Sequence, residues 1–177
     1  MIIEFFKSAL YLLGEWGIFI LFFIAAFQLR HTANFLAYFI VGFVINIIIN
    51  TFLKAFIKQP RPSNIQDLKH ILEKHGIPFC YQYGFTSDLF GMPSGHAQTV
   101  AFIFAYLFFT DRTSINIYII VLSLLGLFNR IYFQYHTVAQ VAVGLLVGSL
   151  VAYVFFCVCR RKLTGKVVQK KDDYFYG

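Results

Sequence analysis

The sequence predicts an all-α protein, a multi-pass bundle of about five helices that cross a membrane. Hydrophobic residues make up 59% of the 177-residue chain and charged residues 13%, with 23 Phe. A soluble domain of this length could not bury so much apolar surface, because a small domain has a high ratio of surface to volume. The chain also holds several apolar runs near the roughly 20 residues that one membrane-spanning helix needs.

The apolar runs set the order of the predicted spans. We expect them over residues 8–29, 33–53, 95–110, 115–133 and 137–159. At about 1.5 Å per residue the third covers only about 24 Å, so we expect it to begin inside the protein or in thinned bilayer. The turns at 30–32 and 111–114 are brief, which predicts antiparallel neighbours. Residues 1–177 should form one domain, with a basic tail over residues 160–177.

One long connection runs from Lys54 to Met92. Within it, residues 63–76 fit a short amphipathic helix, because Ser63 and Gln66 match a capping box and Gly76 can end the helix. Such a helix could lie in the membrane interface beside a site. A solvated helical loop fits the same pattern.

The net charge of +7 does not predict nucleic-acid binding. The basic residues lie in the tail after the last apolar run, in the long connection and at the ends of spans, and they form no basic face. The tail is expected to set the topology or to contact anionic lipid. The three cysteines show no CxxC spacing, so neither a disulfide framework nor a zinc site is predicted.

Three polar clusters fall on the same side of the predicted bundle. They are Lys54 with Arg61-Pro62, then Pro93-Ser94-Gly95-His96, then Arg130 with His136. The Lys and Arg side chains can surround a phosphate with positive charge. The second cluster lies at a helix N-terminus, where free backbone N–H groups and the helix dipole favour an anion. The two histidines can supply the nucleophile and the acid that phosphoryl transfer through a covalent intermediate needs.

Each residue of these clusters, taken alone, could instead have a purely structural role. A single cation at a membrane edge is usually a topology anchor, and a single interfacial His is usually structural. Three clusters on one face are harder to explain in that way. No carboxylate-rich pattern of a magnesium site accompanies them, so the cations would supply the charge neutralisation and neither metal nor cofactor is expected.

Further polar and small residues inside the spans point to the same face. Asn46, Asn50 and Lys54 are spaced at i, i+4 and i+8, so they form one stripe that leads to the clusters. Glu15 lies inside the first span and needs a partner, for which Lys54 and Arg130 are the candidates. Gly144 and Gly148 form a GxxxG pair, which predicts close helix packing.

The patterns Lys-x6-Arg-Pro, Pro-Ser-Gly-His and Arg-x5-His, in this order over residues 54–140, resemble the type 2 phosphatidic acid phosphatase (PAP2) superfamily. The resemblance implies a helical bundle with its site at one membrane face and a phosphatase that works without metal. It implies that His136 attacks phosphorus and becomes a phosphohistidine, while His96 protonates the leaving oxygen. The residues that would hold the phosphate are Lys54, Arg61, Ser94, Gly95 and Arg130.

Two positions depart from the family's pattern. Asn129 stands where the family has Ser, and Gln140 stands where it has the Asp that orients the nucleophile. His136 and Gln140 are i and i+4 on a helix, so the amide oxygen can still accept a hydrogen bond from the imidazole. The negative charge that would stabilise an imidazolium is lost. Gln at this position resembles the dolichyl-diphosphatase and glucose-6-phosphatase branches, and residues 91–98 and 135–141 look closer to the first.

These observations favour a phosphatase of a polyprenyl (dolichyl-type) diphosphate. A diphosphate leaves as a phosphomonoester, a better leaving group than an alkoxide, so a less activated nucleophile could suffice. Alternatives are a phosphatase of phosphatidic acid or another lipid monophosphate, a glucose-6-phosphatase-like enzyme, for which five spans are few, and a non-catalytic lipid-phosphate binding protein of the same fold. The expected partners are the lipid substrate and the bilayer, without nucleic acid, and the oligomeric state is open.

The distribution of charge predicts the orientation. Once Lys54, Arg61 and Arg130 are assigned to phosphate binding, the remaining Lys and Arg are more numerous on the side of the tail. The positive-inside rule then puts the tail in the cytosol and the site on the luminal or extracytoplasmic face. Both branches named above imply the endoplasmic reticulum lumen if the host is eukaryotic.

Overall fold

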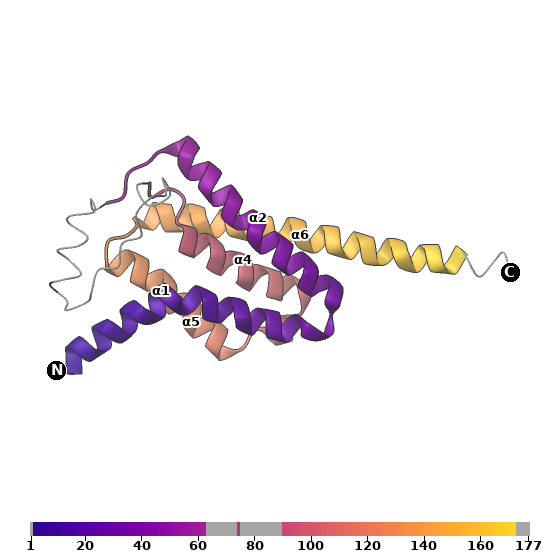
Figure 1. Cartoon of the computed structure of the whole chain (residues 1–177), viewed down its shortest axis with the longest axis horizontal. Helices are drawn as coiled ribbons and strands as arrows, with labels where there is room; N and C mark the ends of the chain where they lie inside the picture. The colour runs from indigo at the N-terminus through magenta and orange to yellow at the C-terminus, as the bar shows by residue number, and fades with distance from the viewer. Residues whose placement is uncertain (1, 63–73, 75–89, 173–177) are drawn as a thin grey trace.

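The computed structural model describes residues 2–62, 74 and 90–172, and it is a helical bundle (Figure 1). The elements are α1 (Ile2–Gln28), a 3-10 turn (Leu29–His31), α2 (Ala33–Ile57), α4 (Gly95–Thr110), a 3-10 turn (Arg112–Ser114), α5 (Ile117–Tyr132) and α6 (Val138–Asp172). In the described residues the only β-type pairing is an isolated bridge between Pro60 and Phe90. The amphipathic helix expected over residues 63–76 lies outside the described residues, apart from Lys74.

Among the described helices, three are long and apolar enough to cross a membrane. They cover Lys7–His31, Ala33–Ile57 and Val138–Leu163, whereas α4 and α5 are apolar helices of 16 residues each. Large apolar side chains point outward, with Phe52 exposed at 72% and Phe56 at 88%. Such a surface suits lipid rather than water. The prediction of an all-α membrane bundle is confirmed.

Two helices run past their predicted ends. α2 continues to Ile57, so Lys54 lies inside its last turn with a buried side chain, not at the start of a loop. α6 continues to Asp172 and extends beyond the bundle (Figure 1), so most of the expected tail prolongs the last span. Lys, Arg and Leu are good helix formers, so the helix does not end where the apolar run ends.

The short helix α4 lies at the centre of the bundle. It contacts α1, α2, α5 and α6, and its Phe102, Ile103, Tyr106 and Leu107 are fully buried. The Phe102 ring stacks on Phe39 of α2 with ring centroids 5.7 Å apart. Because neighbouring helices surround it, α4 does not need the length of a lipid-facing span. This agrees with the expectation that the third span begins inside the protein.

α6 packs against α4 at backbone distance through its two glycines. A Cβ on Gly144 would lie 2.6 Å from the carbonyl oxygen of Ser94, and one on Gly148 would overlap the carbonyl oxygen of Gln98. Neither position has room for a side chain. The close packing predicted from the GxxxG pair is confirmed.

Gly148→Ala is expected to destabilise the protein by about 1–3 kcal/mol, because the new methyl group forces α6 away from α4. Thermal unfolding in detergent micelles measures the effect. Gly17→Ala is the matched control, since nothing lies within 4 Å of a Cβ at Gly17. Equal melting temperatures for the two variants would contradict this account of the helix contact.

Candidate active site

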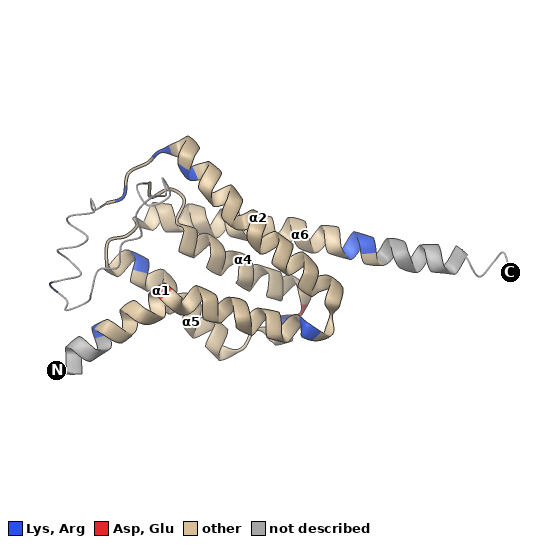
Figure 2. Cartoon of the chain, viewed as in Figure 1, with Lys and Arg blue, Asp and Glu red and all other residues tan. Residues whose placement is uncertain are grey.

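The structure brings the three polar clusters together at one end of the bundle. Lys54 lies in the last turn of α2, Ser94 caps the N-terminus of α4, Arg130 lies in the last turn of α5, and His136 precedes α6. Figure 2 shows that the Lys and Arg residues of the described chain lie near helix ends, with stretches that hold neither between them. The clusters lie at the same end of the bundle because consecutive helices run antiparallel, as predicted.

The His136 side chain is buried and fixed from two directions. Its backbone N–H donates to the carbonyl oxygen of Arg130 at 3.1 Å, and its Nδ1 lies 3.3 Å from Oε1 of Gln140. The expected bond between positions i and i+4 is therefore present. With a proton on Nδ1 donated to the amide oxygen, the lone pair of the neutral ring resides on Nε2.

The surroundings of His136 favour the neutral imidazole. Burial, together with the charges of Arg61, Lys54 and Arg130, lowers the pKa of His136 to about 3. The hydrogen bond to Gln140 opposes the shift. The free base is the nucleophilic form of a histidine, and this ring holds that form at neutral pH.

Gln140 closes a capping box at the start of α6. Its backbone N–H donates to Oγ1 of Thr137 at 3.2 Å, and its Oε1 accepts from the backbone N–H of Thr137 at 3.2 Å. These reciprocal bonds define a Thr-x-x-Gln box. Sequence reasoning missed this cap, although the pattern is readable in the chain. The cap fixes the side chain that contacts the His136 ring.

The amide nitrogen of Gln140 binds the segment that carries Arg61. Nε2 donates to the carbonyl oxygen of Pro60 at 2.9 Å and lies 3.4 Å from Oε1 of Gln59. Gly91 covers the same amide, since a Cβ there would lie 2.5 Å from it. An Asp carboxylate has no proton to donate to a carbonyl oxygen. The Gln found in this chain therefore does something that the family's Asp cannot do.

The N-terminus of α4 offers backbone donors beside His136. The N–H of Ser94 donates to the carbonyl oxygen of Gln140 at 3.0 Å, and Oγ of Ser94 accepts from the N–H of Ala97 at 3.4 Å. The N–H groups of Gly95 and His96 have no acceptor within the helix, because they belong to its first turn. The helix dipole adds partial positive charge at the same place.

Buried amides join α2 to α4 beneath the cations. Nδ2 of Asn50 donates to Oε1 of Gln98 at 2.8 Å, and Nε2 of Gln98 donates to Oδ1 of Asn46 at 2.9 Å. Asn50 Nδ2 also lies 3.2 Å from the carbonyl oxygen of Pro93. The predicted stripe of Asn46, Asn50 and Lys54 thus faces the site, and Lys54 at its end is 6% exposed. Sequence reasoning did not identify Gln98 as the partner.

Arg130 is buried between a carboxylate and an aromatic ring. Its Nη2 lies 2.8 Å from Oε1 of Glu15, and its guanidinium carbon lies 4.6 Å from the centroid of Tyr135. Burial raises the pKa of Tyr135, so the ring stays neutral. Of the two partners predicted for Glu15, the structure selects Arg130 for the close contact. Tyr135 was not among the predicted site residues. In the sequence, only its position next to His136 could have pointed to its contact with Arg130.

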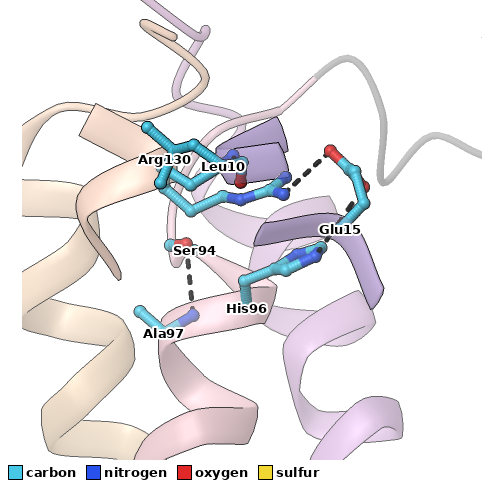
Figure 3. Close-up of polar contacts among 7 residues, drawn as sticks. Leu10, Glu15, Ser94, His96, Ala97 and Arg130 are labelled. Carbon is cyan, nitrogen blue, oxygen red and sulfur yellow. Dashed lines mark hydrogen bonds and ion pairs between the residues drawn. The ribbon is translucent and has the colours of Figure 1, made fainter. Parts of the chain in front are cut away.

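The other predicted site residues are His96 and Arg61. His96 lies on the first turn of α4, with Nε2 3.9 Å from Oε2 of Glu15 (Figure 3). Arg61 is half-buried and acts on His136 through its charge. Across the described residues, no three His, Cys, Asp or Glu side chains are grouped as metal ligands.

Fold and site together define a helical membrane bundle with two histidines and several basic side chains gathered at one end. The chain belongs to the PAP2 superfamily, whose sequence model it matches over residues 35–163. The matched range includes all three motifs and leaves α1 outside it. The resemblance seen in the sequence is confirmed.

A curated relative has the name dolichyldiphosphatase and comes from Saccharomyces cerevisiae. It is 31% identical to this chain over 104 residues, which cover 50% of this chain and 43% of the relative. The match therefore spans less than half of that protein. No solved structure matches the chain.

The lowered pKa of His136 predicts a loss of stability in acid. The folded pKa lies below the unfolded value of about 6.5, so between these values only the unfolded chain binds the proton. Between pH 7 and pH 5 this difference removes about 2 kcal/mol of stability. Thermal unfolding in detergent at both pH values should show a larger drop for the wild type than for His136→Gln. Equal drops would contradict the buried neutral imidazole.

Proposed function

We propose that the chain is a lipid phosphatase that converts a polyprenyl (dolichyl-type) diphosphate to the monophosphate through a phosphohistidine at His136. The observation that supports this most strongly is the environment of that ring. It is buried and neutral, its Nδ1 contacts Gln140, and the charges of Lys54, Arg61 and Arg130 act on it. Such a site combines a nucleophile with the positive charge needed to bind a phosphate and to stabilise its transition state.

In the first step the Nε2 lone pair of His136 attacks the terminal phosphorus. The bridging P–O bond breaks and its electron pair stays on the oxygen of the departing polyprenyl monophosphate. That oxygen takes the proton from Nε2 of His96. The cations and the N–H groups of Gly95 and His96 bind the equatorial phosphoryl oxygens, where charge is concentrated in the transition state.

In the second step water hydrolyses the phosphohistidine. His96, now neutral, takes one proton from the water as its oxygen attacks phosphorus. The P–N bond breaks, and its electron pair returns to Nε2 of His136. Inorganic phosphate leaves, and both histidines are back in their starting protonation states.

Gln140 favours a diphosphate over a monophosphate as substrate. The amide orients His136 without the negative charge that would stabilise a developing imidazolium. A phosphomonoester leaves more readily than an alkoxide, so the diphosphate needs less activation of the nucleophile. The name of the yeast relative agrees with this choice.

The site is expected to face the lumen of the endoplasmic reticulum, with the end of α6 in the cytosol. Lys54, Arg130 and His136 lie at the end of the bundle opposite Arg30 and Arg112. The Lys and Arg residues after α6's apolar stretch then follow the positive-inside rule. A lipid-linked phosphate reaches this end along the apolar surface of the bundle.

The first test measures phosphate release from a long-chain polyprenyl diphosphate by the full chain in detergent, with EDTA present. We expect release by the wild type and none by His136→Gln, because the amide cannot form the phosphoenzyme. Brief reaction with a substrate carrying radioactive terminal phosphate should label the wild type in an acid-labile, base-stable form. A faster reaction with phosphatidic acid would favour a monophosphate phosphatase. Tight lipid binding without release would favour a non-catalytic binding protein.

Gln140→Glu is expected to lower kcat/KM about tenfold or more, although it places a negative charge beside His136. The carboxylate cannot donate to Pro60, and a buried acceptor left without its donor costs about 1–3 kcal/mol. Kinetics with the diphosphate substrate measure the effect. A faster Gln140→Glu enzyme would show that charge matters more than the bond to Pro60.

A further inference from the structure

Glu15 is a charged side chain on an apolar helix. It lies in the Lys7–His31 stretch of α1, and its side chain is 30% exposed. A carboxylate in such a helix is costly unless it has partners, and residues of this kind mark functional sites. Glu15 belongs to none of the three motifs and lies outside the residues that match the family. Its two oxygens nevertheless reach two residues of the proposed site (Figure 3).

The first oxygen of Glu15 orients Arg130. Oε1 accepts from Nη2 at 2.8 Å, while Nε of Arg130 is buried and has no hydrogen-bond partner among the described residues. Arg130 is 3% exposed, so water does not satisfy this donor. A guanidinium presents several donors in one plane. Holding one nitrogen on Glu15 fixes that plane and leaves Nε for a phosphate oxygen.

The second oxygen of Glu15 lies near His96 without consuming its proton. Oε2 is 3.9 Å from Nε2, which is beyond hydrogen-bond length, and Nε2 has no hydrogen-bond partner within the described part of the chain. Burial opposes a positive charge on this imidazole most strongly, and the nearby Arg130, His136 and Lys54 oppose it as well. A carboxylate at this distance favours that charge.

We infer that Glu15 is a positioning residue of the active site, which favours the protonated form of His96 against the surrounding cations and aims Arg130 at the phosphate. The inference rests on the proposed function. Glu15 exchanges no proton in the cycle: the proton that leaves Nε2 of His96 goes to the leaving oxygen and is replaced from water. The carboxylate acts through its charge and through its bond to Arg130.

A purely structural role for Glu15 leads to different measurements. If the carboxylate only neutralised Arg130 so that α1 could pack on α5, its loss would lower stability without changing the protonation of His96. Glu15→Gln distinguishes the two roles, because the amide keeps an oxygen that can accept from Arg130 and removes the charge. Gly17→Ala, two residues further along the same helix, is the control.

The experiment follows His96 directly by NMR of the full chain in micelles with labelled histidine, assigned with His96→Asn. In Glu15→Gln the titration midpoint of His96 should fall by about one pH unit. The alkaline limb of the kcat profile should move to lower pH by the same amount, with a smaller change in KM. Glu15→Asp should recover part of both effects, and Gly17→Ala should match the wild type.

The possible failures are distinguishable. An unchanged His96 midpoint and an unchanged pH profile in an active Glu15→Gln enzyme would overturn the inference and leave the proposed function standing. A wild type that releases no phosphate would overturn the proposed function, and the catalytic part of the inference with it. The NMR midpoint would then still decide whether Glu15 controls the charge of His96.

Discussion

The backbone contact between α4 and α6 is the constraint on which the site depends. Because Gly144 and Gly148 have no Cβ, α6 lies directly against the carbonyl oxygens of Ser94 and Gln98. This approach brings the N-termini of both helices together, where the N–H of Ser94 donates to the carbonyl oxygen of Gln140. The free N–H groups of α4 therefore face the loop that carries the His136 ring. Any larger residue in the glycine pair would separate the first turn of α4 from the His136 ring.

Gln140 converts this helix contact into a defined position for the His136 ring. Its backbone and side chain close the capping box with Thr137, its oxygen contacts His136, and its nitrogen binds Pro60. One amide thus joins the third motif to the first. An Asp could orient the imidazole and stabilise its charge, but it would leave the Pro60 carbonyl without a donor. With Gln in place of Asp, the histidine loses a stabilising negative charge. In return, the segment before Arg61 gains a hydrogen bond to the amide nitrogen.

The parts of this arrangement that were predictable from the sequence are those encoded locally. Apolar runs gave the helices, and the GxxxG spacing gave a face for close packing. The ends of α2 and α6 were misjudged because Lys and Arg end an apolar run without ending a helix. The choice of partner for Glu15 was left open between two cations, since spacing along one helix does not say which neighbour faces it. The bond between Gln140 and Pro60 was invisible for the same reason, whereas the Thr-x-x-Gln cap was readable.

The balance of charge explains why a site for anions contains a carboxylate. Lys54 and Arg130 are nearly fully buried at the edge of an apolar bundle, and Arg61 adds its charge to theirs. Like charges gathered in a medium of low dielectric constant repel strongly when no anion is bound. Glu15 lowers that repulsion at Arg130, yet it leaves one donor of the guanidinium and the Nε2 atom of His96 unengaged. In the proposed site, this partial neutralisation lowers the repulsion at Arg130 and still leaves its Nε for an anion. In the proposed reaction, a diphosphate would bring more negative charge to these cations than a monophosphate.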